Sequence, residues 1–248
     1  MPLPKRVLDL FCGAGGAAMG LHRAWPEAEI VGVDIKPQPR YPFKFIQADA
    51  MEFPLERFDF IWASPPCQAY SVGSARWRKN GSRKYPDLIA PTRQRFKALG
   101  VNYCIENVQG AKKFLIEPFQ LCGQMFGLGV VRHRLFEANF FVLQPAHPNC
   151  FGAVIRAVAV GVYGGAETFS YSAKHRRDYL SVSGHGPPGR FYRAVTVAGH
   201  GGNSSTFRLQ AWKDAMGIDW MTRDELTQSG PPAYSEFIAR QVPFAAAS

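Results

Sequence analysis

Cysteine is scarce in this 248-residue sequence, and none of the five cysteines forms a CxxC pair. An odd number of widely spaced cysteines does not suit a disulfide framework. No group of His, Cys or carboxylate residues shows the sequence spacing of a metal site. We therefore expect a reducing compartment, no structural disulfide and no metal ion.

Long apolar runs are also missing, and residues 1–6 lead straight into a strand-like segment instead of a signal peptide. No run is long enough to cross a bilayer, which excludes a membrane-spanning protein. The sequence has no internal repeat and no low-complexity tract. It predicts a soluble protein of the cytoplasm.

Acidic residues are outnumbered, with 19 Asp and Glu against 29 Lys and Arg. The net charge of +10 and the pI of about 9.6 suggest a polyanionic partner, nucleic acid first. The alternative is a charge that serves only solubility. With 46% hydrophobic residues, the chain can build one sizeable core and a small second lobe.

Short apolar runs alternate with helical patterns in the first half of the chain. Such alternation predicts an α/β fold with a doubly wound, mostly parallel sheet. Turn-forming and charged residues follow the runs, at the sheet edge where this architecture binds ligands. The expected strands lie at 6–11, 29–33, 43–47, 58–63 and 102–105, and the expected helices at 17–25 and 87–99.

The composition of the sequence changes at about residue 142, where glycines become frequent and helical periodicity disappears. We interpret 142–206 as a small, irregular, β-rich region, and 1–141 with 207–248 as the main domain. Helical patterns return at 207–216 and 232–242. Between them, Thr222 and Glu225 have the spacing of a capping box.

A glycine-rich turn, Phe11 to Gly16, separates the first strand from the first helix. Gly13, Gly15 and Gly16 allow a tight turn and a close approach of the backbone to a ligand. The turn is shorter than GxGxxG and lacks the lysine of a P-loop. That favours a carboxylate-bearing nucleoside such as S-adenosylmethionine over a dinucleotide, although a purely structural turn remains an alternative.

Two aspartates follow the next two strands. Asp34 has the position of an acidic residue that binds ribose hydroxyls. Asp49 is placed to accept a hydrogen bond from an adenine amino group. Either side chain can instead cap a turn or a helix.

Cys67 lies in Ser64-Pro65-Pro66-Cys67-Gln68, directly after an apolar strand. Two prolines end the strand and stiffen the turn, so the thiol is held in a fixed position at the ligand-binding edge of the sheet. A nucleophile requires such a position. The alternative is an inert cysteine buried in a loop.

Three further features surround this pattern. Glu106 follows the fifth strand and would lie near the Cys67 turn, as a group that binds or protonates a substrate ring. Arg132 and Arg134, two apart in an alternating stretch at 130–136, would share one strand face and grip a carbonyl or phosphate. The basic stretch 75–85 is a candidate loop that closes over a nucleic-acid backbone. Their alternatives are an ordinary ion pair, a charged strand face and a solvated loop.

In their order along the chain, these motifs resemble the cytosine-C5 DNA methyltransferase family over residues 1–140. The segments that carry the resemblance are Asp9-Leu10-Phe11-Cys12-Gly13-Ala14-Gly15-Gly16, Pro66-Cys67-Gln68 with Tyr70-Ser71, Glu106-Asn107-Val108 and Arg132-His133-Arg134. The chain departs from the family near its end, where Ala233-Tyr234-Ser235 replaces a GNS-like turn. Its presumed recognition region is also short.

The resemblance implies a Rossmann-like, S-adenosylmethionine-dependent methyltransferase domain, with 142–206 as the target-recognition region. Catalysis would then rest on Cys67, Glu106, Arg132 and Arg134. The implied cofactor-binding residues are Phe11, Gly13, Gly15, Gly16, Asp34, Asp49 and Pro66.

The implied substrate is a cytosine that leaves double-stranded DNA and forms a covalent adduct with Cys67. The resemblance implies that the enzyme works in a bacterial or phage-infected cell. Restriction-modification is one biological role that it could serve there. An RNA cytosine-C5 methyltransferase acting on transfer RNA is the nearest alternative. A non-catalytic nucleic-acid-binding module is another.

Overall fold

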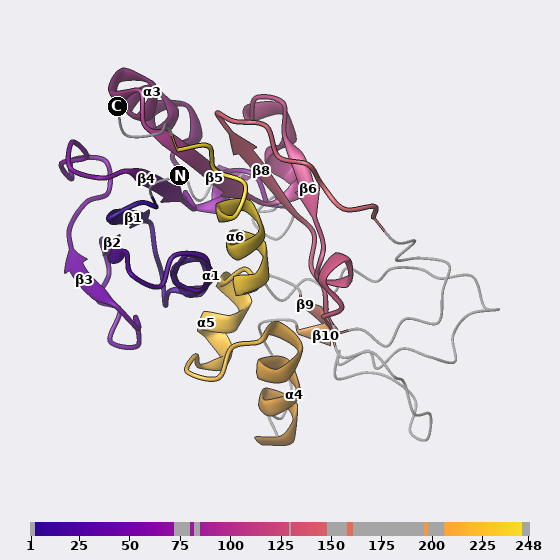
Figure 1. Ribbon diagram of the computed structural model, residues 1–248. Helices are drawn as coiled ribbons and strands as arrows, with labels where there is room; N and C mark the ends of the chain where they lie inside the picture. Colours follow the sequence, from indigo (N-terminus) through magenta and orange to yellow (C-terminus); the bar gives the residue numbers. More distant parts are fainter. Residues whose placement is uncertain are drawn as a thin grey trace. The chain divides into compact units, whose positions relative to one another are not determined.

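The computed structural model describes residues 3–71, 80–81, 85–128, 130–147, 158–160, 196–197 and 206–244 (Figure 1). The chain forms two compact units. The first comprises Met1–Leu121, Arg134–Gln144 and Ser229–Ser248, and the second comprises Cys122–His133 and Pro145–Gln228. Among the described residues, no helix is both long and apolar enough to span a membrane.

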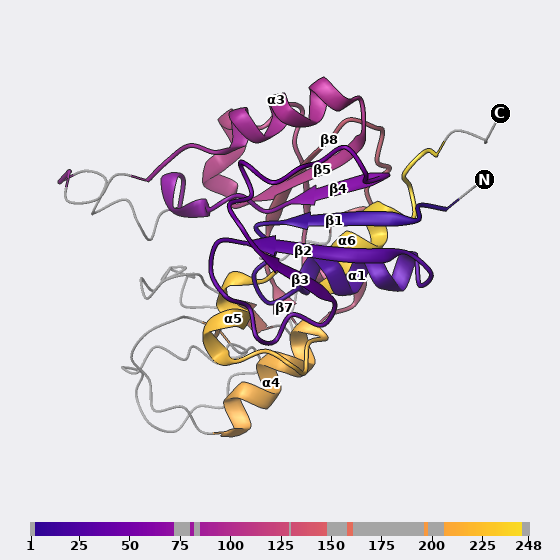
Figure 2. The same ribbon diagram turned by 90° about the vertical axis from the view of Figure 1, so that its left-hand side faces the viewer.

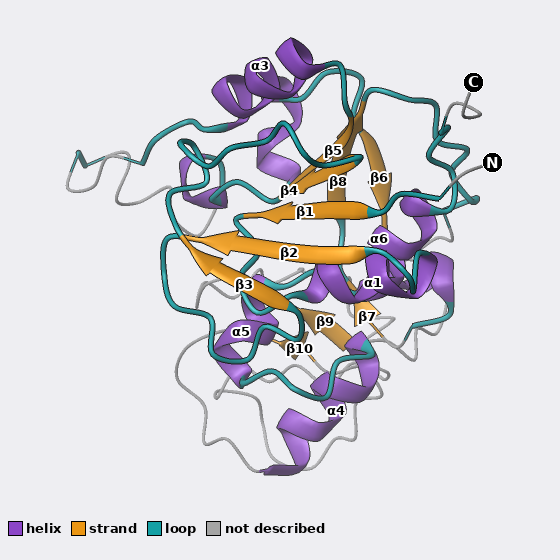
Figure 3. Ribbon diagram, turned by 60° about the vertical axis from the view of Figure 1, so that its left-hand side comes forward, coloured by secondary structure: helices purple, strands orange, loops and turns teal. Residues whose placement is uncertain are grey.

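The first unit is built on a seven-stranded sheet with the order β3-β2-β1-β4-β5-β8-β6 (Figure 3). Neighbours from β3 to β5 are parallel, and β8 runs antiparallel to both β5 and β6. This confirms the predicted doubly wound, mostly parallel sheet. Its strands are β1 (Arg6–Leu10), β2 (Glu29–Asp34), β3 (Lys44–Gln47), β4 (Phe60–Ala63), β5 (Asn102–Asn107), β6 (Phe119–Leu121) and β8 (Arg134–Ala138).

Helices cover both faces of this sheet (Figure 2). Helix α3 (Ile89–Leu99) contacts β5, and its Ile89 and Phe96 share one buried apolar cluster with Leu8 and Leu10, because alternate β1 side chains point to that face. The helix begins two residues later than predicted, since the Asp87 side chain accepts the N–H of Ile89. Helices α1 (Gly16–Ala24) and α6 (Pro232–Ala239) pack against each other on the opposite face. Two 3₁₀ helices, η1 (Cys67–Ala69) and η3 (Gln109–Phe114), follow β4 and β5.

Helices α1 and α6 approach so closely that a side chain at Gly20 has no space. A Cβ atom there would lie 2.0 Å from the Pro232 carbonyl oxygen and 2.1 Å from the Ser235 hydroxyl oxygen. The first of these atoms is backbone, so the clash cannot be relieved by a side-chain rotation. This contact joins the last helix of the chain to the first.

Gly20→Ala is therefore expected to lower the free energy of unfolding by about 1–3 kcal/mol, the usual cost of overpacking. Gly230→Ala is the matched control, because a Cβ atom at Gly230 meets nothing within 4 Å. Urea denaturation of both variants measures the difference. Equal midpoints for the two variants would contradict this packing.

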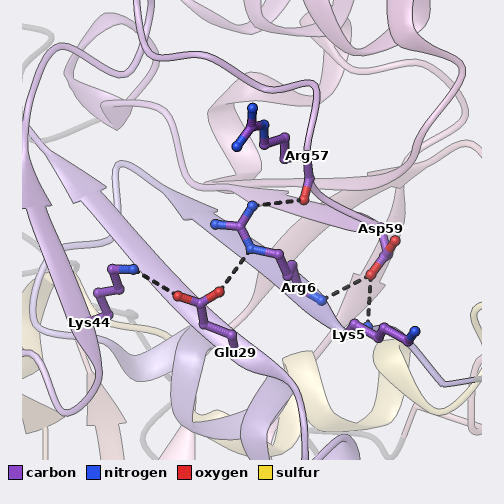
Figure 4. A network of polar contacts seen from close by, with 6 residues as sticks. All are labelled: Lys5, Arg6, Glu29, Lys44, Arg57 and Asp59. Atoms are coloured by element: carbon purple, nitrogen blue, oxygen red, sulfur yellow. Dashed lines mark hydrogen bonds and ion pairs between the residues drawn. The ribbon is translucent and has the colours of Figure 1, made fainter.

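A network of exposed polar contacts joins the strand starts at the amino-terminal edge of the sheet (Figure 4). Arg6 and Lys44 both bind the Glu29 carboxylate at 2.8 Å, and the Asp59 carboxylate accepts the N–H groups of Lys5 and Arg6. Lys44, followed by Arg6, lowers the pKa of Glu29. Exposed pairs such as these stabilise a fold only slightly. They link the first residues of the strands, at the edge of the sheet opposite the carboxyl ends.

The second unit contains a small parallel sheet of order β10-β9-β7. The predicted capping box is confirmed, since Thr222 and Glu225 exchange hydrogen bonds before α5. Most of the predicted β-rich region lies outside the described residues. The elements of this unit are η4 (Gly123–Phe126), β7 (Val130–Val131), β9 (Val158–Val160), β10 (Thr196–Val197), α4 (Thr206–Met216) and α5 (Arg223–Gln228).

The expectation of one extended strand over 130–136 is wrong. β7 ends at Val131 and pairs with β9, whereas β8 begins at Arg134 and pairs with β5 and β6. The chain changes from one sheet to another between them. Arg132 and Arg134 therefore do not share a strand face.

Candidate active site at the carboxyl edge of the sheet

The order of the first unit's strands reverses between β1 and β4. After β1 the chain adds β2 and β3 on one side, and then β4 and β5 on the other (Figure 2). The segments that follow β1 and β4 thus leave neighbouring strands at the same edge. Such a switch point is where open α/β sheets bind their ligands. Here the two segments are the glycine loop (Phe11–Gly16) and the Cys67 turn (Ser64–Gln68).

The glycine loop has a left-handed backbone at Phe11 (φ 55°), Gly13 (φ 48°) and Gly15 (φ 84°). Phe11 is one of the non-glycine residues with this strained conformation, which is frequent at functional sites. Among the described residues other than Gly13 and its chain neighbours, no heavy atom lies within 4 Å of the point where a Cβ atom on Gly13 would stand. The backbone is therefore open to a ligand at Gly13.

Gly16 has a different environment from Gly13. A Cβ atom on Gly16 would lie 1.9 Å from the Ser229 hydroxyl oxygen and 2.7 Å from the Gly230 carbonyl oxygen. The segment before α6 thus packs directly on the start of α1. Sequence reasoning missed Ser229 and Gly230, although the Ser-Gly-Pro-Pro run is a visible turn signal.

Tyr234 and Ser235 lie in the interior of the first unit. The Tyr234 ring is 2% exposed and meets Phe136 edge to face, with centroids 5.9 Å apart. The Ser235 hydroxyl donates to the Ala17 carbonyl oxygen at 2.8 Å. Their described contacts are those of packing between α6, α1 and the sheet.

Asp34 supports the glycine loop directly. One carboxylate oxygen accepts the Gly13 N–H at 3.0 Å, and the other accepts the Lys36 N–H at 2.9 Å. Asp49, in contrast, is exposed and accepts the Met51 N–H at 2.8 Å, as an Asx turn does. Both aspartates follow their strands as predicted, and both make the local turn contacts that were the alternative interpretation.

The Cys67 turn is held by backbone hydrogen bonds. The Ser64 N–H donates to the Leu10 carbonyl oxygen at the end of β1. Pro66 precedes η1, and the Cys67 carbonyl oxygen accepts the N–H groups of Tyr70 and Ser71, both at 2.9 Å. The turn is thereby fixed next to the strand that leads into the glycine loop.

Asn107 links this turn to β5. It is 1% exposed, and its Nδ2 atom donates to the Pro65 carbonyl oxygen at 2.9 Å. Sequence reasoning gave this residue no role of its own. In the sequence, the only sign of this role is an amide residue directly after Glu106. The hydrogen bond links the end of β5 to the Cys67 turn.

Glu106 forms an ion pair with Arg134. The Arg134 Nε atom lies 2.8 Å from Oε1 of Glu106, and these side chains are 9% and 15% exposed. Because β8 is antiparallel to β5, its first residue reaches the carboxyl edge of the parallel strands. Arg132 belongs to the second unit, where its Nη2 atom donates to the Thr227 carbonyl oxygen. The structure therefore brings one of the two predicted arginines to Glu106.

Accessibility separates Cys67 from two other cysteines of the first unit. Burial raises the pKa of the Cys12 thiol and of the Cys104 thiol well above the ordinary value. Cys67 is only partly buried. Since the thiolate is the nucleophile, Cys67 is the better placed of the three to react.

Asp9 lies just before the glycine loop and is 1% exposed. Burial raises its pKa well above the ordinary carboxyl value, and the Tyr41 hydroxyl donates to it at 3.3 Å. A raised pKa shifts the equilibrium of Asp9 toward the neutral carboxyl. The predicted basic loop at 75–85 lies mostly outside the described residues.

Comparison with known proteins supports the resemblance seen in the sequence. The family model for C-5 cytosine-specific DNA methylase matches residues 5–114. That span contains the glycine loop, the Cys67 turn and Glu106, and members of this family use S-adenosylmethionine. A search of curated proteins returned no match.

Several solved structures of methyltransferases are similar to this chain at low identity and low TM-score. Entamoeba histolytica methyltransferase EhMeth is 12% identical, with 96% of this chain and 97% of that chain covered and a TM-score of 0.48. An RNA methyltransferase from Salinibacter ruber, in complex with S-adenosyl-L-homocysteine, is 12% identical over 58% and 87%, with a TM-score of 0.30. The plantazolicin methyltransferase BpumL, bound to a triazolic analogue and SAH, is 18% identical over 42% and 39%, with a TM-score of 0.30. The chain thus spans about two fifths of that last relative.

Proposed function

We propose that this chain is a DNA (cytosine-5-)-methyltransferase that transfers a methyl group from S-adenosylmethionine to a cytosine. One observation carries the proposal. The glycine loop and the Cys67 turn leave the neighbouring strands β1 and β4, and Glu106 is the second-last residue of the next strand, β5. All three lie within the span that matches the C-5 cytosine methylase family.

The residues around the glycine loop fit S-adenosylmethionine. Gly13 leaves open space beside the loop backbone, and the start of α1 places backbone N–H groups where a carboxylate is favoured. The Asp34 carboxylate would accept hydrogen bonds from ribose hydroxyls. Phe11, which follows β1, and Pro66, which follows β4, would supply apolar surface for the cofactor. The cofactor supplies an electrophilic methyl group when bound.

Cytosine C5 is a poor nucleophile, and the role of Cys67 is to activate it. The Cys67 thiolate forms a bond to C6, and the ring electrons shift to C5. Glu106, as a carboxylic acid, donates its proton to N3 and accepts a hydrogen bond from the exocyclic amine, which stabilises the negative charge that the thiolate brings to the ring. The proton returns to Glu106 when sulfur leaves. Arg134 holds the Glu106 carboxylate in place and is the arginine available to the O2 carbonyl. C5 takes the methyl group, a base removes the C5 proton, and Cys67 leaves as C6 loses its bond to sulfur.

A cytosine within a duplex cannot reach a thiol on this turn, so the base has to leave the stack. That step costs a few kcal/mol, and phosphate contacts from a basic protein help to offset it. The net charge of +10 supports a nucleic-acid substrate. The predicted recognition region, 142–206, would contact the target.

Parallel assays separate DNA from RNA as the substrate. The full chain is incubated with labelled S-adenosylmethionine and either duplex DNA or transfer RNA, and the products are digested to nucleosides. We expect labelled 5-methyldeoxycytidine from DNA. Label in RNA alone would replace the proposal with a transfer RNA enzyme, and no label in either would favour a non-catalytic module.

Asp34→Ala is expected to weaken S-adenosylmethionine binding by about 10-fold or more, because it removes charge-assisted hydrogen bonds to ribose and to the loop. Titration calorimetry measures the change. Asp49→Ala is the matched control, since its exposed carboxylate contacts Met51, and we expect a smaller effect. An unchanged dissociation constant for Asp34→Ala would refute its role.

A further inference from the structure

The second unit brings together three potential metal ligands that are far apart in the sequence. The ligand atoms of Cys122, His133 and His147 all lie within 4.8 Å of one another. The two imidazole Nε2 atoms are 3.1 Å apart. Sequence spacing did not indicate this cluster, because the three residues come together only in the folded chain.

Tight turns build this cluster. Leu128 donates to the Gly123 carbonyl oxygen, and Gly127 has a left-handed backbone (φ 68°) that ends η4. A Cβ atom on Gly123 would lie 2.3 Å from the Val130 carbonyl oxygen, so only glycine allows β7 to pass so close. The chain thus returns past Cys122 and places His133 beside it.

The position of the Cys122 sulfur is fixed by the local backbone. Cys122 precedes η4, and its side chain accepts a hydrogen bond from the Met125 backbone N–H. Cys122 is also fully buried, whereas His133 is half-buried and His147 is exposed. The cluster therefore has one interior ligand and one side open to solvent.

We propose that Cys122, His133 and His147 bind one zinc ion. One thiolate and two imidazoles form a donor set that zinc prefers over calcium or magnesium. Zinc bonds of about 2.0–2.1 Å to nitrogen and 2.3 Å to sulfur place tetrahedral donors roughly 3.3 to 3.6 Å apart. The Nε2 atoms already have nearly this separation. Solvent or a further side chain completes the tetrahedron at the open side.

Zinc at this site would join three separate segments of the second unit. These are the residue before η4, the end of β7 and the segment 145–147. Among the described residues, Met125 and Val131 pack against Cys122. A metal would add cross-links between these segments. The function of the zinc is structural, and it is independent of the reaction proposed for Cys67.

Elemental analysis of the full chain, purified without a histidine tag and dialysed, tests the proposal. We expect about one zinc per chain, falling at least 5-fold in Cys122→Ser and in His133→Ala. Cys67→Ser and His22→Ala are the matched controls, since each removes a partly buried residue of the same type from the first unit. Both controls should keep their zinc. Equal zinc in all variants, or none in the wild type after incubation with zinc, would overturn the site.

Cobalt substitution of the wild type gives a second measurement that needs no variant. Co²⁺ should give the intense visible bands of a tetrahedral ion and a thiolate charge-transfer band, both removed by added zinc. A spectrum of hexa-aqua Co²⁺ would overturn the proposal. Cofactor binding by the first unit, measured alongside, shows that a variant without metal is still folded there.

Discussion

Replacing Cys67 by serine is expected to lower methyl transfer by about 10³-fold or more. A hydroxyl is a much weaker nucleophile than a thiolate, so C6 of the cytosine is not attacked and C5 is not activated. The turn should survive the change, because its described hydrogen bonds, from the backbone N–H groups of Ser64, Tyr70 and Ser71 and from the Asn107 side chain, do not use the thiol. S-adenosylmethionine binding should therefore stay within about 3-fold of the wild type.

Cys104→Ala is the matched control for this experiment. Cys104 is fully buried in β5, and burial raises the pKa of its thiol, so it is unsuited to attack a base. Its loss should leave the rate within a few-fold. Full activity in Cys67→Ser, measured as label transferred to DNA in a single turnover, would rule out a covalent mechanism.

Glu106→Gln is expected to slow methyl transfer by about 10²–10³-fold, the cost of losing one group that stabilises developing charge. Glutamine keeps the shape of the side chain and an oxygen for Arg134, but it has no acidic proton to give to N3. Since the charge on the ring grows as sulfur attacks C6, the loss should appear in the single-turnover rate. Affinity for DNA should change much less.

Glu236→Gln controls for the removal of an ion-paired carboxylate. Glu236 pairs with Arg240 at 2.8 Å on α6, in a surface pair that should not affect the reaction. An effect of Glu106→Gln on DNA affinity with an unchanged single-turnover rate would show that Glu106 binds substrate without stabilising the reacting ring.

Much of the first unit could be predicted from the sequence because its signals are local. Short apolar runs ended by Gly, Pro, Asp or Asn define β1 to β5, and a parallel sheet then brings their carboxyl ends to one edge. That reasoning placed Glu106 near the Cys67 turn, and β5, which carries Glu106, pairs in parallel with β4, which precedes the turn. The capping box at Thr222 and Glu225 was likewise readable from two residue types at a fixed spacing.

What could not be predicted depends on contacts between distant segments. The alternating residues 130–136 look like one strand, yet their two halves pair with strands of different sheets. Ser229 meets Gly16, and Asn107 reaches Pro65, through a fold that no local pattern specifies. The cluster of Cys122, His133 and His147 arises in the same way, from glycine turns that reverse the chain.

The central claim is that the sulfur of Cys67 bonds to C6 of a cytosine, and a mechanism-based trap tests it most directly. In DNA that contains 5-fluorocytosine, the fluorine at C5 cannot be removed as a proton, so the covalent intermediate should accumulate. With S-adenosylmethionine present, we expect a protein–DNA adduct that survives denaturing electrophoresis and maps to Cys67 by mass spectrometry. An intact wild-type chain that methylates DNA without forming this adduct, or forms it at another residue, would contradict the account.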